Sequence, residues 1–173
     1  MTRFLDDIRT ARCRIAPLAL GDVDALTAIT DATVTARIHF LPEPFTQADA
    51  RKLIVQGTAD NRFYGIRACT DGALLGVVGV HGGPRGRDVE IGYWLASDAR
   101  GRGLATEVLA ALMPRLALDY PACRVVAECH PDNGRSQALL ERMGFVFTGQ
   151  PGRRPGRVVL ARSSQAPGRI DVC

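Results

Sequence analysis

The hydrophobic pattern of this chain changes its period near position 100. Residues 89–95 form a strand-like run, and after a glycine-rich turn apolar side chains recur at helical spacing from Leu104 to Leu116. Residues 124–129 then form a second, short strand-like run. A strand, a helix and a strand in this order make a right-handed crossover between parallel strands. This unit predicts a sheet that is at least partly parallel, with helices packed on its faces.

The segments around this unit predict antiparallel strands and further helices. Asp71-Gly72 lies between two strand-like runs and is a strong hairpin turn. The expected fold class is therefore α/β, with a mixed, mostly antiparallel sheet of about seven strands and helices on both faces. All 173 residues are expected to form a single domain, with a core over about 10–162 and a polar tail over 163–173. The elements expected around the crossover are strands over 12–18, 63–69, 74–80, 145–148 and 157–161, helices beginning at Asp22 and Thr46, and a helix ending at Gly144.

Composition limits the function without identifying it. The formal net charge of +4 and the pI of about 9.0 suit an anionic partner, either nucleic acid or a phosphorylated cofactor, and equally a bias toward arginine codons. The five cysteines and three histidines show no metal-ligand spacing, so no metal is expected. Cysteines of this kind, together with the lack of an apolar stretch long enough to span a membrane, predict a cytoplasmic protein without a membrane partner.

The segment from Arg100 to Ala105 joins the first strand of the crossover to its helix. The first amides of a helix have no partner within it and carry partial positive charge. Glycine at 101 and 103 removes the β-carbons that would hold an anion away from those amides. The segment is therefore a candidate phosphate cradle, although a flexible turn with solvated arginines fits it as well. It lacks the third glycine of a dinucleotide-binding fingerprint and the lysine of a P-loop.

Two blocks of the sequence together resemble the GNAT acetyltransferase superfamily. The first is the run 89–95 followed by Arg100, Gly103 and Ala105, which meet the family pattern Arg/Gln-x-x-Gly-x-Gly/Ala. The second lies over residues 133–145 and contains the runs NGRS and LLERMGF. Two blocks in the right order and at the right distance are more specific than either block alone.

The front of the chain extends the resemblance to one branch of that superfamily. Residues 10–26, which begin Thr10-Ala11-Arg12, and residues 46–53 are similar to the enzymes that acetylate N-terminal alanines of ribosomal proteins. In all, the resemblance spans about residues 10–161. It implies the GNAT fold, in which the fourth and fifth strands splay apart.

The resemblance implies acetyl-CoA as the cofactor and indicates where its parts would lie. The pantetheine arm would occupy the gap between the splayed strands, where Asn133 would hydrogen-bond it unless this side chain only caps a helix. The 3′-phosphate of the cofactor would meet Arg102, Arg135 or Arg142. The residues implied to bind the pantetheine arm are Trp94, Leu95, Ala96, Asn133 and Ser136, and those implied to bind the pyrophosphate are Arg100, Gly101, Arg102, Gly103, Leu104, Ala105 and Thr106.

The implied reaction is attack of a neutral amine on a thioester carbonyl, which needs a proton acceptor and a proton donor. Glu90 is the candidate base, acting through water, or else a structural carboxylate paired with an arginine. Many relatives carry a tyrosine as the acid seven residues after the asparagine, where this chain has Leu140. Ser136 is the substitute implied by the ribosomal-protein branch, unless its hydroxyl only bonds back to the loop.

The acceptor amine stays open at this stage. A protein N-terminus and a small-molecule amine, such as an antibiotic, a polyamine or an amino acid, both fit the resemblance, in a monomer or a homodimer. A non-catalytic acetyl-CoA-binding module would keep the phosphate cradle but would have no use for Glu90, Asn133 and Ser136 together. A nucleic-acid-binding protein is disfavoured, because the arginines of 149–157 are the one cluster that suggests it.

Overall fold

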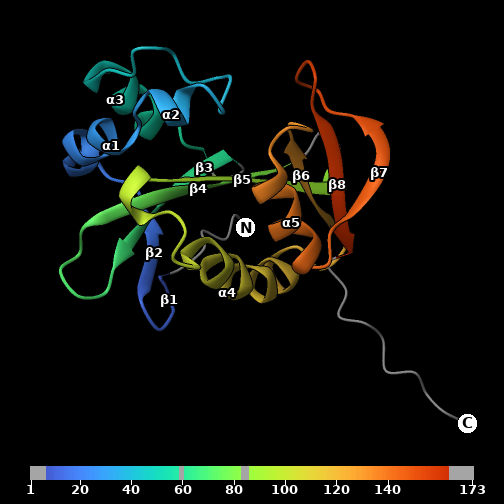
Figure 1. The fold of residues 1–173 in the computed structure, drawn as a ribbon. Coiled ribbons are helices and arrows are strands. Elements are labelled where there is room, and N and C mark those ends of the chain that lie inside the picture. Colours follow the sequence, from blue (N-terminus) through green and yellow to red (C-terminus); the bar gives the residue numbers. More distant parts are fainter. Residues whose placement is uncertain (1–6, 59–60, 83–85, 164–173) are drawn as a thin grey trace, which may run out of the picture.

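The computed structural model describes residues 7–58, 61–82 and 86–163. Its strands are β1 (Ile8–Arg9), β2 (Cys13–Pro17), β3 (Asn61–Ala68), β4 (Leu74–Gly82), β5 (Asp88–Leu95), β6 (Arg124–Cys129), β7 (Val146–Pro151) and β8 (Val158–Ser163). They form one sheet in the order β1-β2-β3-β4-β5-β6-β8-β7 (Figure 1). Among these strands, β5 and β6 pair in parallel and the other neighbours pair antiparallel. The predicted mixed sheet and its parallel crossover are confirmed.

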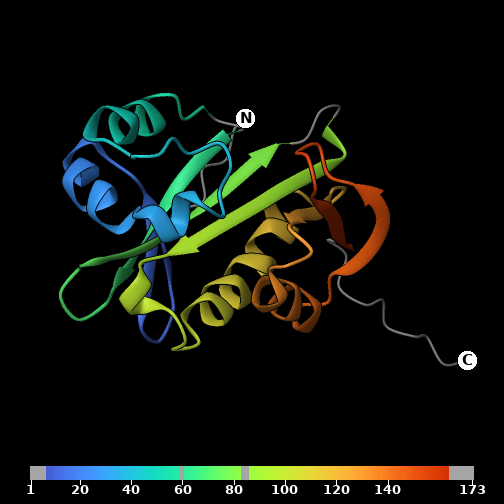
Figure 2. The same ribbon diagram turned by 45° about the horizontal axis from the view of Figure 1, so that its top comes forward.

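Two groups of helices cover the two faces of the sheet (Figures 1 and 2). On one face lie α1 (Val23–Ile29), α2 (Ala32–Thr35) and α3 (Gln47–Val55). On the other face lie α4 (Leu104–Asp119) and α5 (Gly134–Arg142). Two short 3-10 helices, η1 (Leu20–Asp22) and η3 (Ser97–Ala99), lead from a strand into a helix. The sheet must therefore be apolar on both faces.

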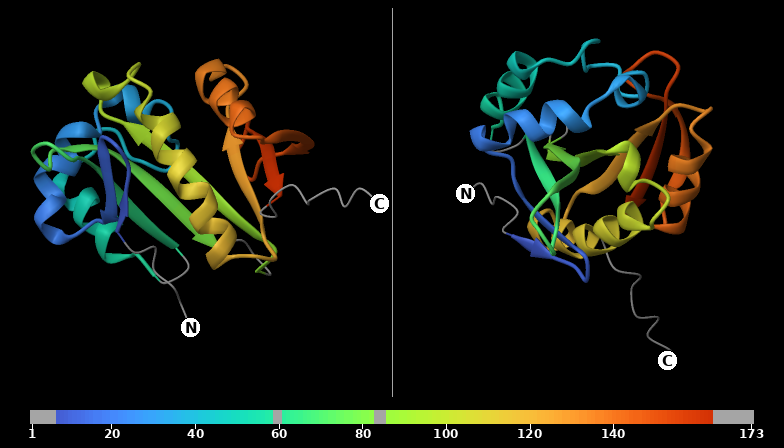
Figure 3. Two further views of the ribbon diagram at one scale, coloured as in Figure 1. Left: turned by 90° about the horizontal axis from the view of Figure 1, so that it is seen from below. Right: turned by 60° about the vertical axis from the view of Figure 1, so that its left-hand side comes forward.

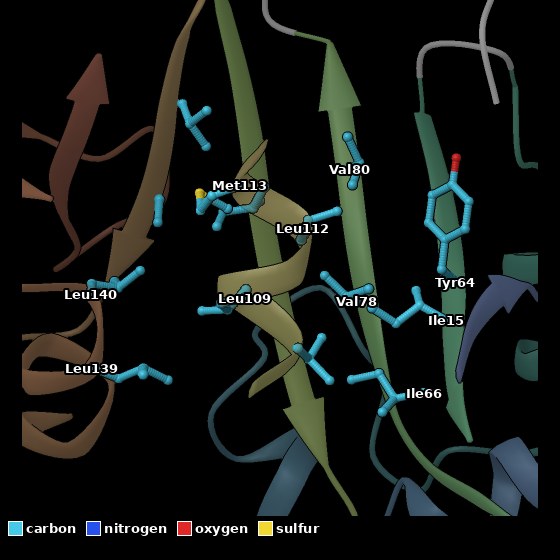
Figure 4. Close-up of a cluster of buried hydrophobic side chains, with 14 of the residues drawn as sticks. Ile15, Tyr64, Ile66, Val78, Val80, Leu109, Leu112, Met113, Leu139 and Leu140 are labelled. Carbon is cyan, nitrogen blue, oxygen red and sulfur yellow. The ribbon is translucent and has the colours of Figure 1, made fainter. Parts of the chain in front are cut away.

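Successive side chains of strand β4 point alternately to the two faces of the sheet and enter two different cores. Val78 and Val80 belong to the larger core, which includes Leu112 of α4 (Figure 4). Val77 points to the other face and belongs to the second core together with Trp94 of β5. Because β4 and β5 are packed on both faces, the β5 strand is a rigid wall for anything that lies beside it.

Two local signals in the sequence act as expected, whereas the side chain of Asp22 caps no amide of α1 and the short helix α2 was not predicted. Thr46 caps α3 in a capping box with Asp49, and Gly72 has a φ of +75° in the turn between β3 and β4. The sheet has one strand more than predicted, because β1 is two residues long and too short to show a period. The expected tail begins at Ser163, the last residue of β8, and residues 164–173 lie outside the described part of the chain. Among the described helices, none is long and apolar enough to cross a membrane.

Strands β5 and β6 pair over a short stretch only. The parallel register joins residues 88–90 to residues 124–126. Strand β5 continues to Leu95 in register with β4, so its second half is paired on the β4 side alone. Figure 3 (left) shows the two strands meeting at one end and separating toward the other. This is the predicted splay, and the strands concerned are β5 and β6 because β1 adds a strand in front.

Candidate functional site

Two hollows meet in the gap between β5 and β6. The larger, here called the groove, has a volume of about 950 Å³ and lies between α2, the N-terminus of α4 and α5. The smaller, here called the pocket, lies between β5, β6 and the hairpin of β7 and β8. Ligands in the two hollows would touch each other inside the gap. The residues that line both are Arg37, Ile38, Tyr93, Trp94, Asn133 and Ser136.

The backbone of β5 offers hydrogen-bonding groups to the gap. The Ala96 N–H donates to the Leu75 carbonyl at 2.8 Å, so the backbone groups of Ala96 face β4. Since these groups alternate in direction along a strand, those of Leu95 and Tyr93 face the gap. The Leu95 carbonyl accepts from Arg100 Nε at 3.1 Å. Of the predicted stretch from Trp94 to Ala96, Leu95 therefore presents its backbone to the gap, while Trp94 lines it with its side chain.

The glycine-rich turn forms the end of the groove. Gly101 and Gly103 have φ angles of +72° and +74°, a region that favours glycine. Gly103 is the N-cap of α4 and no side chain caps the helix there. The amides of Leu104, Ala105 and Thr106 are therefore the uncapped first amides of a helix of 16 residues, and all three residues line the groove. The turn has the local geometry of an anion site.

The arginines near the groove differ in their roles. The Arg100 guanidinium donates to the Leu95 carbonyl and, at 2.9 Å, to Thr33 Oγ1, so it ties α2 to the end of β5. Arg135 and Arg142 line the groove. Arg102 has an exposed side chain, and its carbonyl accepts from Arg12 Nη1 at 2.9 Å.

The start of α5 brings two hydroxyl groups together in the gap. Asn133 Oδ1 accepts from the Ser136 N–H at 3.3 Å and so caps the helix. Ser136 Oγ lies 3.0 Å from the Tyr93 hydroxyl oxygen. Burial raises the pKa of Tyr93 above its ordinary value, so its phenol is protonated at neutral pH. Leu140, which stands where many relatives carry a tyrosine, is 1% exposed.

Tyr93 and its pairing with Ser136 were not among the sequence predictions. The hydroxyl lies on an otherwise apolar strand face, packed against the core of α4 and α5. A tyrosine beside Trp94 on the strand that borders the gap was the available signal, but its partner on α5 is decided by the tertiary fold.

Glu90 lies on the pocket side of the gap. It is 7% exposed, and its Oε1 lies 2.8 Å from Arg154 Nη1. Arg154 also meets Glu128 Oε2 at 3.4 Å. Glu90 is thus paired with an arginine, as expected for a structural carboxylate. It also lines the pocket, as a catalytic base must. Glu90 and Tyr93 are an odd number of positions apart, so their side chains point to opposite faces of the sheet.

Aromatic rings complete the pocket. Phe63 lies between His81 and Trp94, with ring centroids 4.9 Å and 6.0 Å away. Burial, aided by the charge of Arg154, lowers the pKa of His81 to about 4, so the imidazole is neutral at neutral pH. The pocket thus combines an ion-paired carboxylate with apolar walls.

The one cysteine that lines the pocket, among the described residues, is buried. Cys129 is 2% exposed, and burial raises the pKa of its thiol. A buried thiol of raised pKa is a poor nucleophile. Within residues 7–58, 61–82 and 86–163, no group of His, Cys, Asp and Glu side chains is arranged to hold a metal ion.

Comparisons with known proteins agree with this geometry. The family model described as Acetyltransferase (GNAT) domain matches residues 12–146. The ribosomal-protein-serine acetyltransferase of Escherichia coli is 34% identical over 77 residues, which cover 44% of this chain and 43% of that protein. The aligned part thus spans less than half of that relative.

Two solved structures show the same fold. A GNAT-family acetyltransferase from Bacillus anthracis has a TM-score of 0.78 at 22% identity, covering 91% of this chain and 98% of its own. RimL, a ribosomal alpha-N-protein acetyltransferase solved in complex with coenzyme A through a cysteine disulfide, has a TM-score of 0.79 at 22% identity, with the same coverage of 91% and 98%.

Proposed function

Because the chain belongs to the GNAT acetyltransferase family, we propose that it is an acetyl-CoA-dependent N-acetyltransferase that acetylates a primary amine by direct attack in a ternary complex. The observation that carries this proposal is the meeting of the groove and the pocket at Tyr93 and Ser136. A donor in the groove and an amine in the pocket would touch in the gap. No enzyme nucleophile is needed there, which agrees with the buried thiol of Cys129.

The residues of the groove fit coenzyme A. A β-carbon at Gly101 would meet nothing within 4 Å, so the backbone of the turn is open to a ligand. The uncapped amides from Leu104 to Thr106 suit the pyrophosphate, and the guanidinium groups of Arg135 and Arg142 suit the 3′-phosphate. When bound, the cofactor supplies the thioester carbonyl that the amine attacks.

Glu90 is the proposed proton acceptor. Arg154 occupies its Oε1, which leaves Oε2 to take a proton from the incoming amine directly or through water. An α-amino group has a pKa near roughly 8 and a lysine near roughly 10.4, so an α-amine needs the weaker base. A carboxylate such as that of Glu90 can serve as such a base.

Ser136 and Tyr93 are the proposed proton donors to the leaving sulfur. Their two hydroxyl groups share one hydrogen bond. Each hydroxyl carries one hydrogen, so when Ser136 donates to Tyr93 the phenol keeps its own O–H for a ligand. When Tyr93 donates instead, the O–H of Ser136 is shared between a ligand and the neighbouring Cys129 thiol. The pair therefore delivers one O–H into the gap. A proton passed to the thiolate is replaced through the pair from water.

A protein N-terminus is the proposed acceptor. The Escherichia coli relative is named as a ribosomal-protein-serine acetyltransferase, and RimL as an alpha-N-protein acetyltransferase. A small-molecule amine is the second candidate, since the pocket itself is small and partly apolar, with Phe40, Phe63 and Trp94 on its walls.

The melting temperature with and without acetyl-CoA tests the proposal. A ligand at about 100 times its dissociation constant adds roughly 2.7 kcal/mol, which corresponds to roughly 5–10 °C for a domain of this size. NADH and ATP serve as controls and should not reproduce the shift. Turnover is then measured on peptides with a free or a blocked α-amine and on polyamines and amino acids. A shift without turnover on the whole panel would instead indicate a non-catalytic binding module.

Replacing Tyr93 by phenylalanine tests the hydroxyl pair. We expect kcat to fall roughly 10-fold, because a positioned proton donor contributes at least that much, while the Kd for coenzyme A changes by less than about threefold. In a Ser136→Ala background the same replacement should change kcat by a clearly different factor, because the hydrogen bond between the two hydroxyl groups is already absent there. Equal losses in both backgrounds would show that the two hydroxyl groups act independently.

A further inference from the structure

The hairpin loop between β1 and β2 contains Thr10 and Arg12, which the proposed chemistry does not use. The Arg12 carbonyl accepts a hydrogen bond from the Cys69 N–H at 2.8 Å, so the loop is bound to the residue that follows β3. The Thr10 hydroxyl donates at 2.6 Å to Glu107 Oε1, in the first turn of α4. A loop near the start of the chain thus reaches the helix that forms the phosphate cradle.

Arg12 makes three contacts that converge on this helix start. Its backbone N–H donates to Glu107 Oε1 at 2.8 Å, and its Nε donates to Glu107 Oε2 at 2.6 Å. Its Nη1 donates to the carbonyl of Arg102 at 2.9 Å. The hydrogen bond from Thr10, followed by those from Arg12, lowers the pKa of Glu107 below its ordinary value, so the carboxylate remains charged.

The contact with Arg102 determines the direction of a peptide group. In a trans peptide the C=O and the following N–H point in opposite directions. Holding the Arg102 carbonyl on Arg12 therefore turns the Gly103 N–H away from Arg12. Gly103 itself lines the groove. Glycines with positive φ flank Arg102 on both sides, which makes this peptide easy to flip when nothing holds it.

We propose that Thr10, Arg12 and Glu107 form a latch that holds the Arg102–Gly103 peptide with its N–H toward the cofactor, so that Arg12 is a positioning residue for pyrophosphate binding. The inference rests on the proposed use of coenzyme A. It assigns a purpose to Thr10 and Arg12, which lie far from the groove in sequence. Without the latch, a flipped peptide would present a carbonyl oxygen to the phosphates.

Calorimetric titration of the full chain with coenzyme A tests the latch. Arg12→Ala should raise the Kd roughly 10-fold, because a lost charge-assisted hydrogen bond and a reoriented donor act together. Arg12→Lys should recover little of this loss, because an ammonium group does not reproduce the fork that spans Glu107 and Arg102. Arg14→Ala is the matched control, since Arg14 is a similarly exposed arginine of the same hairpin that pairs with Asp7. It should change the Kd less than twofold.

Glu107→Gln separates the latch from simple electrostatics. Removing a negative charge near an anion site should tighten binding if charge alone matters. The latch requires the opposite, a Kd that rises roughly threefold or more, because the contacts from Thr10 and Arg12 weaken. Melting temperatures without ligand identify any variant that has not folded. If Arg12→Ala is such a variant, the Kd of Glu107→Gln decides whether the latch exists.

The outcomes are distinct. A Kd restored by Arg12→Lys, an equal loss in Arg14→Ala, or tighter binding by Glu107→Gln would each overturn the latch while the proposed function stands. A wild-type chain that does not bind coenzyme A would overturn the cofactor proposal and the latch together.

Discussion

Replacing Gly103 by valine is expected to raise the Kd for coenzyme A by roughly 100-fold or more. A β-branched residue is strained at a φ of +74°, so the turn must leave its conformation. Space does not prevent the change, because a β-carbon there would meet Arg12 Nη2 at 3.6 Å, an ordinary contact. The expected loss follows from the amides that we propose bind the phosphates, each worth roughly 1.5–3 kcal/mol to a charged ligand.

Gly72→Val is the control for Gly103→Val. Gly72 has a φ of +75° and open space around its α-carbon, so valine meets the same strain in the hairpin of β3 and β4. Both variants should lose stability, roughly 1–3 kcal/mol each. Gly72→Val should retain coenzyme A binding, as measured by calorimetry. A Gly103→Val Kd within threefold of the wild type would contradict the assignment of the turn as the pyrophosphate site.

Replacing Glu90 by glutamine is expected to lower kcat roughly 100-fold at pH 7 and to change the Kd for acetyl-CoA by less than about threefold. Glutamine keeps the size of the side chain but cannot accept the amine proton. The deficit should shrink toward pH 9, because an α-amine of pKa near roughly 8 is then already neutral. Steady-state kinetics at both pH values measures the change.

Asp88→Asn provides the matched control on the same strand. Asp88 is also a carboxylate paired with an arginine, Arg124, at 2.9 Å, but it does not line the pocket. Its replacement should leave kcat within about twofold. A deficit of Glu90→Gln that is the same at pH 7 and pH 9 would mean that Glu90 only holds Arg154, and the base assignment would be wrong.

Several features follow from the sequence because they are local. Gly103, Asn133 and Gly144 are fixed by the backbone conformation that a turn or a helix end requires, and each occupies the predicted place. The crossover follows from a change in hydrophobic period and from the handedness of connected strands. The family, inferred from two blocks of residues, is confirmed by the match over residues 12–146.

Other features required the tertiary structure because their partners are distant in the chain. Tyr93 and Ser136 are 43 positions apart, and Arg12 and Glu107 are 95 apart. No periodicity connects such residues, since a period describes which face a side chain takes and not what it meets there. For Glu90 the sequence left two roles open, a base and a structural carboxylate. The fold pairs Glu90 with Arg154 and also places it in the lining of the pocket, so both roles remain open. The sequence by itself therefore determined most of the elements, the glycine-rich turn before α4 and the family. The tertiary structure alone decided which hydroxyl groups and charges meet in the gap, because that depends on how the sheet splays and how the helices pack against it.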